Sequence, residues 1–291
     1  MESQPDKSPL IVIVGETASG KSALALDIAR QFNGEIIAAD SRTIYKGMDI
    51  GTAKPSLDEQ RLVKHYLLDI VTPDQPFTAA DFKQRAVAAI HDICARGKLP
   101  VLVGGTGLYI DAVIYDFTFN PKPNDAQRQA LQNLSVKELQ ALLQEQGIPL
   151  PLNAKNPRHL IRQVETGGSA ISDRQLRMNT LVLGMQPGRE QLEARIHDRI
   201  TSMFKQGLEQ EARVLFEQYG LSCRALQTIG YAEFLPYFDG QVSLQDVQIA
   251  IEKNTLQYAK RQRTWFRRNK SIHWLDKKEQ SVDLMTTFLN K

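Results

Sequence analysis

The chain has 291 residues, of which 42% are hydrophobic and 24% charged, and its 36 basic and 33 acidic side chains give a formal net charge of +3. This length and composition favour a globular protein of one large or two modest domains, and they exclude disordered, collagen-like and low-complexity chains. No apolar run approaches the roughly 18 residues of a membrane-spanning helix, and two distant cysteines, Cys94 and Cys223, indicate neither a disulfide framework nor a zinc site, so a reducing cytoplasm is expected.

The first 115 residues alternate short apolar runs with helical patterns. The runs typical of buried parallel strands are residues 10–14, 35–39, 66–70 and 100–103. Helical spacing covers residues 23–32 and 78–96, and the second helix has Thr78 as a candidate N-cap and Gly97 as its stop. This alternation predicts an α/β fold with a parallel sheet flanked by helices.

The pattern changes at the turn-rich segment 120–124. Residues 125–147 and 157–165 then have helical spacing, and the apolar run 179–185 indicates a return to the sheet. We therefore predict a small helical insertion domain at residues 116–178 within a core formed by residues 1–115 and 179–291. The rest of the core is predicted as a helical region at 190–219, interrupted near Gly207, a helix at 247–269 and a strand at 271–275.

The strongest motif is a phosphate-binding loop between the first strand and the first helix. Its residues are Gly15, Glu16, Thr17, Ala18, Ser19, Gly20, Lys21 and Ser22, which match G-x-x-x-x-G-K-[ST] in full. Backbone N–H groups at the helix N-terminus form an anion site, Lys21 adds a positive charge, and the Ser22 hydroxyl is suited to bind Mg²⁺. The motif predicts a P-loop NTPase-like fold, but ATP, GTP and an isolated diphosphate all remain possible ligands.

Two other features are expected at the same edge of the sheet. Asp40 ends the second strand, where ligands of α/β proteins bind, and its carboxylate suits a general base or an Mg²⁺ ligand. A turn or N-cap aspartate is the alternative. Gly104-Gly105-Thr106-Gly107 ends a later strand and offers the Thr106 hydroxyl.

A basic segment lies near the C-terminus. The stretch from Glu252 to Lys270 contains seven basic residues and one acidic residue, and Trp265 and Phe266 lie within it. Basic and aromatic side chains together fit a polyanion, either a phosphate ligand or an RNA backbone, and a solvated helix face is the alternative. The five histidines show no metal-ligand spacing.

Residues 40–55, DSRTIYKGMDIGTAKP, closely resemble the D-S-x-x-x-Y-x-x-M-D-I-G-T-A-K-P pattern of the tRNA dimethylallyltransferases, also called tRNA isopentenyltransferases. The resemblance spans almost the whole chain. Further blocks agree in the same order: residues 14–22, 65–70, 103–109, 199–211, 229–231 and 260–265.

The resemblance implies transfer of the dimethylallyl group of dimethylallyl diphosphate to the N6 amine of the adenosine just 3′ of the tRNA anticodon. The loop then binds a diphosphate leaving group, with Lys21, the loop N–H groups and Mg²⁺ neutralising its charge. Asp40 accepts a proton from the amine, and Thr17 and Thr106 match family positions near the substrates. A monomeric cytoplasmic enzyme is implied as well.

The resemblance also implies a set of RNA-binding residues, because a target base in a single-stranded loop is flipped out for the reaction. Asp40, Ser41, Arg42, Thr43 and Thr106 would lie against the flipped base. The insertion would hold the anticodon stem-loop. The further residues expected to contact tRNA are Arg158, His159, Leu160, Ile161 and Arg162 in the insertion, and Gln227, Thr228, Ile229, Gly230, Tyr231 and Ala232 in the core.

One departure from the family pattern leaves a question. Where the family has T-R-Q-x-A-K-R-Q, this chain has Leu256 in place of the arginine, which in the family is expected to bind the diphosphate. Arg261 and Arg263 are candidates to replace it, and the sequence does not decide between them. Three alternatives to the tRNA enzyme are an adenylate isopentenyltransferase acting on free nucleotides, a P-loop kinase of a small metabolite, and a non-catalytic RNA-binding descendant.

Overall fold

The computed structural model describes residues 8–119, 125–168 and 175–290. It divides into two compact units, one formed by Met1–Asp116 with Leu176–Lys291 and the other by Phe117–Gln175. The chain thus leaves the first unit once and returns to it. Within the described ranges, no helix has the length and apolar character needed to cross a membrane.

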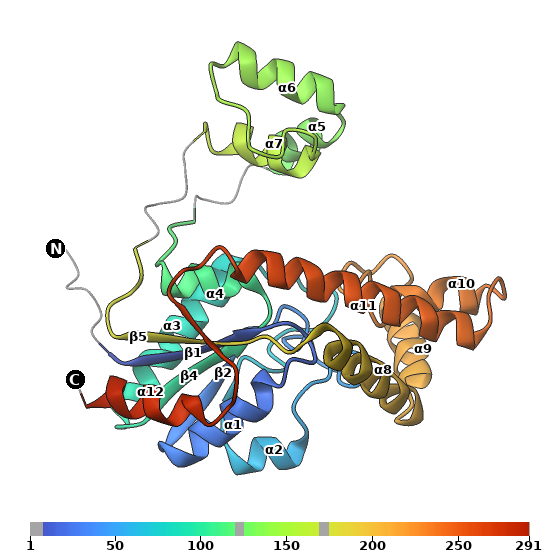
Figure 1. Cartoon of the computed structure of the whole chain (residues 1–291). Coiled ribbons are helices and arrows are strands. Elements are labelled where there is room, and N and C mark those ends of the chain that lie inside the picture. Colours follow the sequence, from blue (N-terminus) through green and yellow to red (C-terminus); the bar gives the residue numbers. More distant parts are fainter. Residues whose placement is uncertain (1–7, 120–124, 169–174, 291) are drawn as a thin grey trace. The chain divides into compact units, whose positions relative to one another are not determined.

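The first unit is built on a parallel sheet whose strands have the order β3-β2-β4-β1-β5-β6 (Figure 1). The strands are β1 (Leu10–Gly15), β2 (Gly34–Ala38), β3 (His65–Tyr66), β4 (Leu99–Gly104), β5 (Thr180–Met185) and β6 (Ile272–Leu275). Ile13 in β1 pairs with Val103 on one side and Leu183 on the other, and all three are buried. The predicted α/β fold is confirmed.

The predicted strand at residues 66–70 is wrong in extent. β3 ends at Tyr66 because Leu67 and Asp69 have φ angles of 64° and 54°, a left-handed backbone that cannot continue an extended strand. The apolar side chains here are instead part of a turn that packs against the body of the unit.

Helices cover both faces of the sheet (Figure 1). One face carries α1 (Lys21–Gln31) and α12 (Gln280–Leu289), whose Ile28 and Met285 pack in one buried cluster with strand residues such as Ile13. The other face carries α3 (Ala79–Ala95), α4 (Gly107–Ile114) and α11 (Leu244–Phe266), and the short α2 (Leu57–Leu62) precedes β3. The sequence analysis did not predict α2, α4 or α12.

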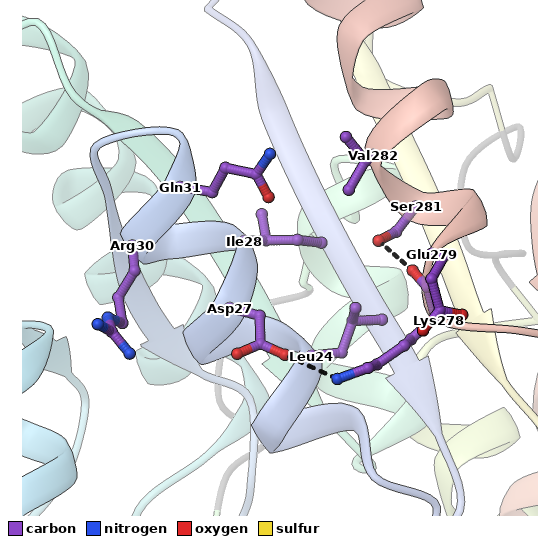
Figure 2. Close-up of a pocket in the computed structure, with 9 residues that line it drawn as sticks. All are labelled: Leu24, Asp27, Ile28, Arg30, Gln31, Lys278, Glu279, Ser281 and Val282. Carbon is purple, nitrogen blue, oxygen red and sulfur yellow. Dashed lines mark hydrogen bonds and ion pairs between the residues drawn. The ribbon is translucent and has the colours of Figure 1, made fainter.

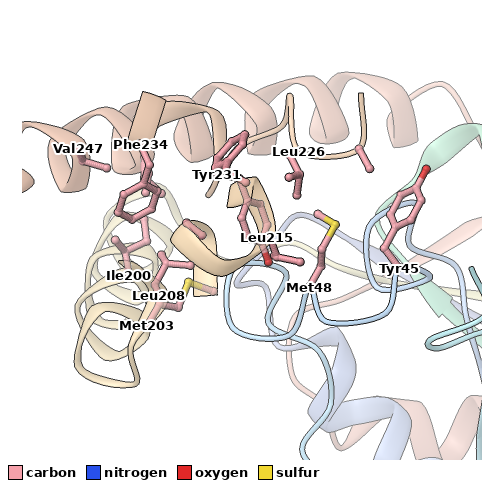
Figure 3. Close-up of a cluster of buried hydrophobic side chains, with 14 of the residues drawn as sticks. Tyr45, Met48, Ile200, Met203, Leu208, Leu215, Leu226, Tyr231, Phe234 and Val247 are labelled. Carbon is pink, nitrogen blue, oxygen red and sulfur yellow. The ribbon is translucent and has the colours of Figure 1, made fainter. Parts of the chain in front are cut away.

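A second hydrophobic cluster extends the unit beyond the sheet (Figure 3). It is formed by α8 (Arg189–Lys205), α9 (Leu208–Tyr219), the 3₁₀ turn η1 (Ala232–Phe234), α10 (Leu235–Phe238) and α11. Gly207, with a φ of 99°, separates α8 from α9, which confirms the predicted interruption. Ile200, Leu208 and Phe234 are fully or almost fully buried here, so this cluster fixes α8, α9 and α11 to one another.

The second unit is a small helical domain with its own core. It contains α5 (Asp125–Gln132), α6 (Val136–Glu145) and α7 (Pro157–Glu165). Leu139, Leu143 and Leu160 are fully buried in its core. The single helical pattern at 125–147 is two helices, because Ser135 caps α6 in a capping box with Glu138. In the first unit, the N–H of Arg177 donates to the carbonyl of Ile114 at 2.7 Å, next to the two points where the chain leaves and returns.

A buried carboxylate at the far end of β2 has a structural role. Glu35 accepts hydrogen bonds from Arg96, Lys98 and the Tyr66 hydroxyl. The Arg96 guanidinium, helped by the other two donors against the effect of burial, lowers the pKa of Glu35 to about 2. This network ties β2 to β3 and to the turn between α3 and β4.

Candidate active site

The phosphate loop lies between the end of β1 at Gly15 and the start of α1 at Lys21. Gly20, the N-cap of α1, has a φ of 96° and provides no side-chain cap, so the first N–H groups of the helix are left for a ligand. The Lys21 ammonium donates to the carbonyl of Glu16 at 3.2 Å, which holds it over the loop. The loop therefore has the donors and the charge of an anion site.

Side chains from α11 fix the loop from outside. The N–H of Thr17 donates to Gln262 Oε1 at 2.8 Å, and Gln262 Nε2 donates to the carbonyl of Gly105 at 2.9 Å. Arg263 pairs with Glu16 at 2.6 Å. Gln262 is 5% exposed, so its amide joins the loops that follow β1 and β4 in a buried bridge.

Asp40 lies beside this bridge, two residues after the end of β2. Its carboxylate accepts a hydrogen bond from the Arg42 N–H at 2.8 Å, and the N–H of Ser41 donates to the Thr106 hydroxyl at 3.0 Å. Gly104 permits this close approach, because a Cβ at that position would lie 2.0 Å from the Ala39 carbonyl oxygen. The structure thus brings Asp40 and Thr106 to the same edge as the phosphate loop.

Two adjoining cavities open at this edge. The larger, about 490 Å³, and the smaller, about 210 Å³, share five wall residues: Thr17, Asp40, Thr52, Ala53 and Arg199. Lys21, Ser22 and Thr43 line only the smaller cavity. Ser41, Arg42 and Tyr258 line only the larger one. Asp40 therefore lies at the boundary between the two cavities.

Two cationic side chains, Lys21 and Arg199, line the smaller cavity together with the carboxylates of Asp40 and Glu59. Burial, followed by the nearby charge of Arg199, lowers the pKa of Lys21 to about 8. The carboxylates of Asp40 and Glu16 act against this shift. Arg199, whose pKa burial also lowers, approaches the Thr17 hydroxyl at 3.3 Å, and no carboxylate of the described ranges pairs with it. Two neighbouring cations beside the N–H groups of a helix N-terminus would stabilise a bound anion.

Tyr258 lines the larger cavity, and Thr106, which lines neither cavity, is joined to the residue after Asp40. The Thr106 hydroxyl accepts a hydrogen bond from the Ser41 N–H at 3.0 Å. Burial, followed by the charge of Asp40, raises the pKa of Tyr258 to about 12, so it is a neutral phenol at physiological pH. Arg261 lies over the Tyr258 ring at 5.5 Å and lines the larger cavity.

The other predicted tRNA-binding residues divide between the two units. In the first unit, Gln227, Thr228, Ile229, Gly230 and Ala232 line the larger cavity. Tyr231 is fully buried, so its side chain is not available to RNA. In the helical unit Arg158, His159 and Arg162 are exposed on α7, whereas Leu160 and Ile161 are buried in that unit's core.

The missing family arginine has no direct replacement on α11. Leu256 packs against the second hydrophobic cluster and does not line either cavity. Arg263 is engaged by Glu16, so the arginines that α8 and α11 contribute to the cavity walls are Arg199 and Arg261. The sequence analysis had no local signal for the roles of Arg199, Gln262 or Tyr258, because they reach the site from α8 and α11.

A cavity of similar volume, about 500 Å³, lies between α1 and α12 (Figure 2). Leu24, Ile28 and Val282 line it, and Lys278 approaches Asp27 at 3.7 Å across its edge. In the described ranges, the buried hydroxyl groups without a hydrogen-bond partner are those of Ser19 and Thr43, which belong to the phosphate loop and to the smaller cavity. The edge with the phosphate loop is therefore the better candidate for an active site.

Comparisons with known proteins agree on one family. Residues 43–269 match the family model described as IPP transferase. The chain is 41% identical over 288 residues to a tRNA dimethylallyltransferase of Anoxybacillus flavithermus, covering 94% of this chain and 92% of that protein. It is 39% identical over 286 residues to that of Bacillus subtilis, with coverages of 93% and 91%.

Solved structures are similar over the same length. The crystal structure of the full-length tRNA isopentenylpyrophosphate transferase from Bacillus halodurans has a TM-score of 0.77 at 34% identity, covering 98% of this chain and 97% of that one. A eukaryotic dimethylallyltransferase described as acting on tRNA has a TM-score of 0.75 at 29% identity, covering 89% and 70%.

Proposed function

The chain belongs to the IPP transferase family, and from that membership we propose that it is a tRNA dimethylallyltransferase. It transfers a dimethylallyl group to tRNA. The donor is dimethylallyl diphosphate, and the acceptor is the N6 amine of the adenosine just 3′ of the anticodon. The observation that carries this proposal is the pair of cavities that meet at Asp40. One lies beside the phosphate loop, and the other is the one we assign to the adenine of the tRNA.

The smaller cavity suits the diphosphate. Breaking the allylic C–O bond leaves the electron pair and negative charge on the diphosphate, so cations close to it stabilise the transition state. Lys21, Arg199 and the loop N–H groups would supply that charge. The phosphate loop therefore holds a leaving group and not a nucleoside triphosphate.

Mg²⁺ fits the same cavity. The Ser22 hydroxyl offers a hard oxygen donor there, and the buried Thr43 hydroxyl has no hydrogen-bond partner among the described residues. In the described residues no group of three or more histidine, cysteine or acidic side chains could hold a metal, so the ion would depend on Ser22 and on diphosphate oxygens. When bound, Mg²⁺ would withdraw charge from the diphosphate.

The larger cavity suits the flipped adenine. The lone pair of the adenine N6 amine is delocalised into the ring. The amine therefore needs a base to accept its proton as the new C–N bond forms. Asp40 lies on the wall that both cavities share, and the Arg42 N–H orients its carboxylate. Asp40 therefore serves as the base, with Thr106 and Tyr258 beside it.

Donor binding is expected to weaken at alkaline pH. The ordinary pKa of lysine lies far above 8, so Lys21 loses its positive charge earlier than usual as the pH rises. The dissociation constant for dimethylallyl diphosphate should therefore rise about 30-fold between pH 7 and pH 9.5. Calorimetry checks this, with Lys21→Arg as the control, because arginine keeps its charge throughout and should give a nearly flat profile. An equally steep rise in Lys21→Arg would contradict the role of Lys21.

The exposed face of α11, together with the turn that follows it, suits the tRNA backbone. Lys260, Arg261 and Arg268 line a shallow surface pocket with Trp265, and Arg268 lies 4.4 Å from the Trp265 ring. Exposed basic side chains on one helix face displace counterions when they bind phosphates. The contact by the helical unit, through Arg158, His159 and Arg162, is a separate part of this proposal.

Binding of tRNA should therefore be strongly salt-dependent. We expect the dissociation constant to rise about 100-fold between 50 and 200 mM salt. Filter binding of wild type and of Lys260→Ala and Arg268→Ala checks this, and each substitution should lower the slope of log affinity against log salt by about one. Unchanged slopes in both variants would exclude this face from the RNA interface.

One assay tests the proposed reaction. Labelled dimethylallyl diphosphate and Mg²⁺ are supplied with an anticodon stem-loop RNA that carries adenosine after the anticodon, and with free AMP in a parallel sample. Label in the RNA alone supports the proposal, and label in AMP indicates a nucleotide-prenylating enzyme. ATP consumption without label transfer indicates a kinase. The cytoplasmic location and the monomeric state remain predictions of the sequence.

A further inference from the structure

Glu211, on α9, binds a run of backbone N–H groups from a segment far away in the sequence. Its Oε2 accepts from Asp49 at 3.1 Å and Ile50 at 2.8 Å, and its Oε1 accepts from Gly51 at 2.9 Å. A fourth donor, the Tyr231 hydroxyl, reaches the same Oε1 at 2.7 Å. Charge-assisted hydrogen bonds from N–H groups to a carboxylate are among the stronger ones in proteins.

Tyr231 makes this contact rigid. It is fully buried in the hydrophobic cluster of Figure 3, and the proximity of Glu211 adds to burial in raising its pKa above the ordinary value. Gly51 lies directly against the ring, because a Cβ at that position would be 2.6 Å from Tyr231. The carboxylate and the ring therefore hold the backbone at Gly51 from two sides.

The segment held in this way forms part of the active site. Thr52 and Ala53 follow Gly51 and belong to the wall that the two cavities share with Asp40. Ala53 has a φ of 52°, a left-handed conformation that a non-glycine residue adopts when its surroundings enforce it. The Thr52 hydroxyl donates to the Met48 carbonyl at 2.7 Å and helps to close the turn.

We infer that Glu211 is a positioning residue for the transfer reaction, acting through the backbone of residues 49–53. This inference rests on the proposed function. Glu211 lines neither cavity, so it acts by holding Thr52 and Ala53 against the reacting groups near Asp40. Such a role affects the alignment of donor and base more than the affinity for tRNA, because misplacement of about 1 Å near reacting atoms costs up to a hundredfold in rate.

The test compares Glu211→Gln with Glu209→Gln. Glu209 lies on the same helix and, like Glu211, accepts a hydrogen bond from a tyrosine hydroxyl, that of Tyr237 at 3.2 Å. It also accepts from Arg213 at 3.0 Å, but within the described structure it has no hydrogen bond to residues 49–53. Hydrogen exchange at residues 49–51 measures how firmly Glu211 and Tyr231 hold this backbone, an arrangement called the clamp below. The measurement does not depend on enzymatic activity. Single-turnover transfer at saturating donor and filter binding of tRNA report on function.

In Glu211→Gln we expect exchange at residues 49–51 to accelerate at least about tenfold and the single-turnover rate to fall about 30-fold. The dissociation constant for tRNA should change less than about threefold. Tyr231→Phe, which removes one of the four donors, should show the same pattern at about a fivefold loss of rate. Glu209→Gln should match wild type in both measurements.

Three results would overturn the inference: unchanged exchange in Glu211→Gln, faster exchange with an unchanged transfer rate, or an equal loss of rate in Glu209→Gln. If Glu211→Gln does not fold, Tyr231→Phe decides by the same criteria. Absence of transfer by wild type would refute the proposed function instead, and the exchange data would still show whether the clamp exists.

Discussion

Replacement of Asp40 by asparagine is expected to lower the single-turnover rate of dimethylallyl transfer about a thousandfold, within the range that a general base contributes. Asparagine keeps the size of the side chain and an oxygen that accepts from the Arg42 N–H, but it cannot take the proton from the adenine amine. Rapid-quench measurement with enzyme in excess over labelled donor gives the rate of the chemical step.

Binding measurements separate this role from that of a ligand-binding residue. The dissociation constants for dimethylallyl diphosphate and tRNA in Asp40→Asn should stay within about fivefold of wild type. Asp58→Asn is a matched control, because Asp58 is exposed on α2 and pairs only with Arg61 in the described structure. A purely binding defect in Asp40→Asn, with a normal rate at saturation, would remove Asp40 from the chemistry.

Replacement of Lys21 by alanine is expected to lower the transfer rate about 100- to 1000-fold, the effect typical of losing one group that stabilises developing charge. Lys21 is half-buried in the smaller cavity beside the loop N–H groups, so its charge acts on the departing diphosphate with reduced screening by water. The rate is measured by single-turnover transfer to the stem-loop RNA.

Affinity for tRNA should be largely spared in Lys21→Ala, because the lysine lines only the cavity assigned to the diphosphate. Lys278→Ala serves as the control, since the Lys278 side chain is 64% exposed at the edge of the cavity in Figure 2. Turnover equal to wild type in Lys21→Ala would refute the assignment of the phosphate loop to the leaving group.

The sequence predicted those parts of the fold that local patterns determine. The buried strands are apolar runs, and the phosphate loop is a contiguous motif between a strand and a helix. The short α2, α10 and α12 were not predicted, because a helix of one to three turns shows too few repeats of the apolar period. β3 was predicted too long, since two residues with positive φ carry no signal in their side-chain types.

Part of the candidate site was predictable because some of its residues lie in local sequence patterns. Asp40 and Lys21 follow strands, so the topology of a parallel sheet brings them together. Gln262, Arg199 and Glu211 come from helices more than a hundred residues farther along the chain, and only the packing of α8, α9 and α11 brings them to the loops. A buried tyrosine such as Tyr231 cannot be distinguished from an RNA-facing one by residue type alone.

The backbone hydrogen bond between Arg177 and Ile114 bears on how the chain came to hold a second folded unit. It joins the residues of the core that come just before and just after the helical unit. The chain between them is therefore a loop whose two ends are held together. The entropy of closing such a loop grows only with the logarithm of its length. A change in the length of this unit is therefore expected to cost the core little stability.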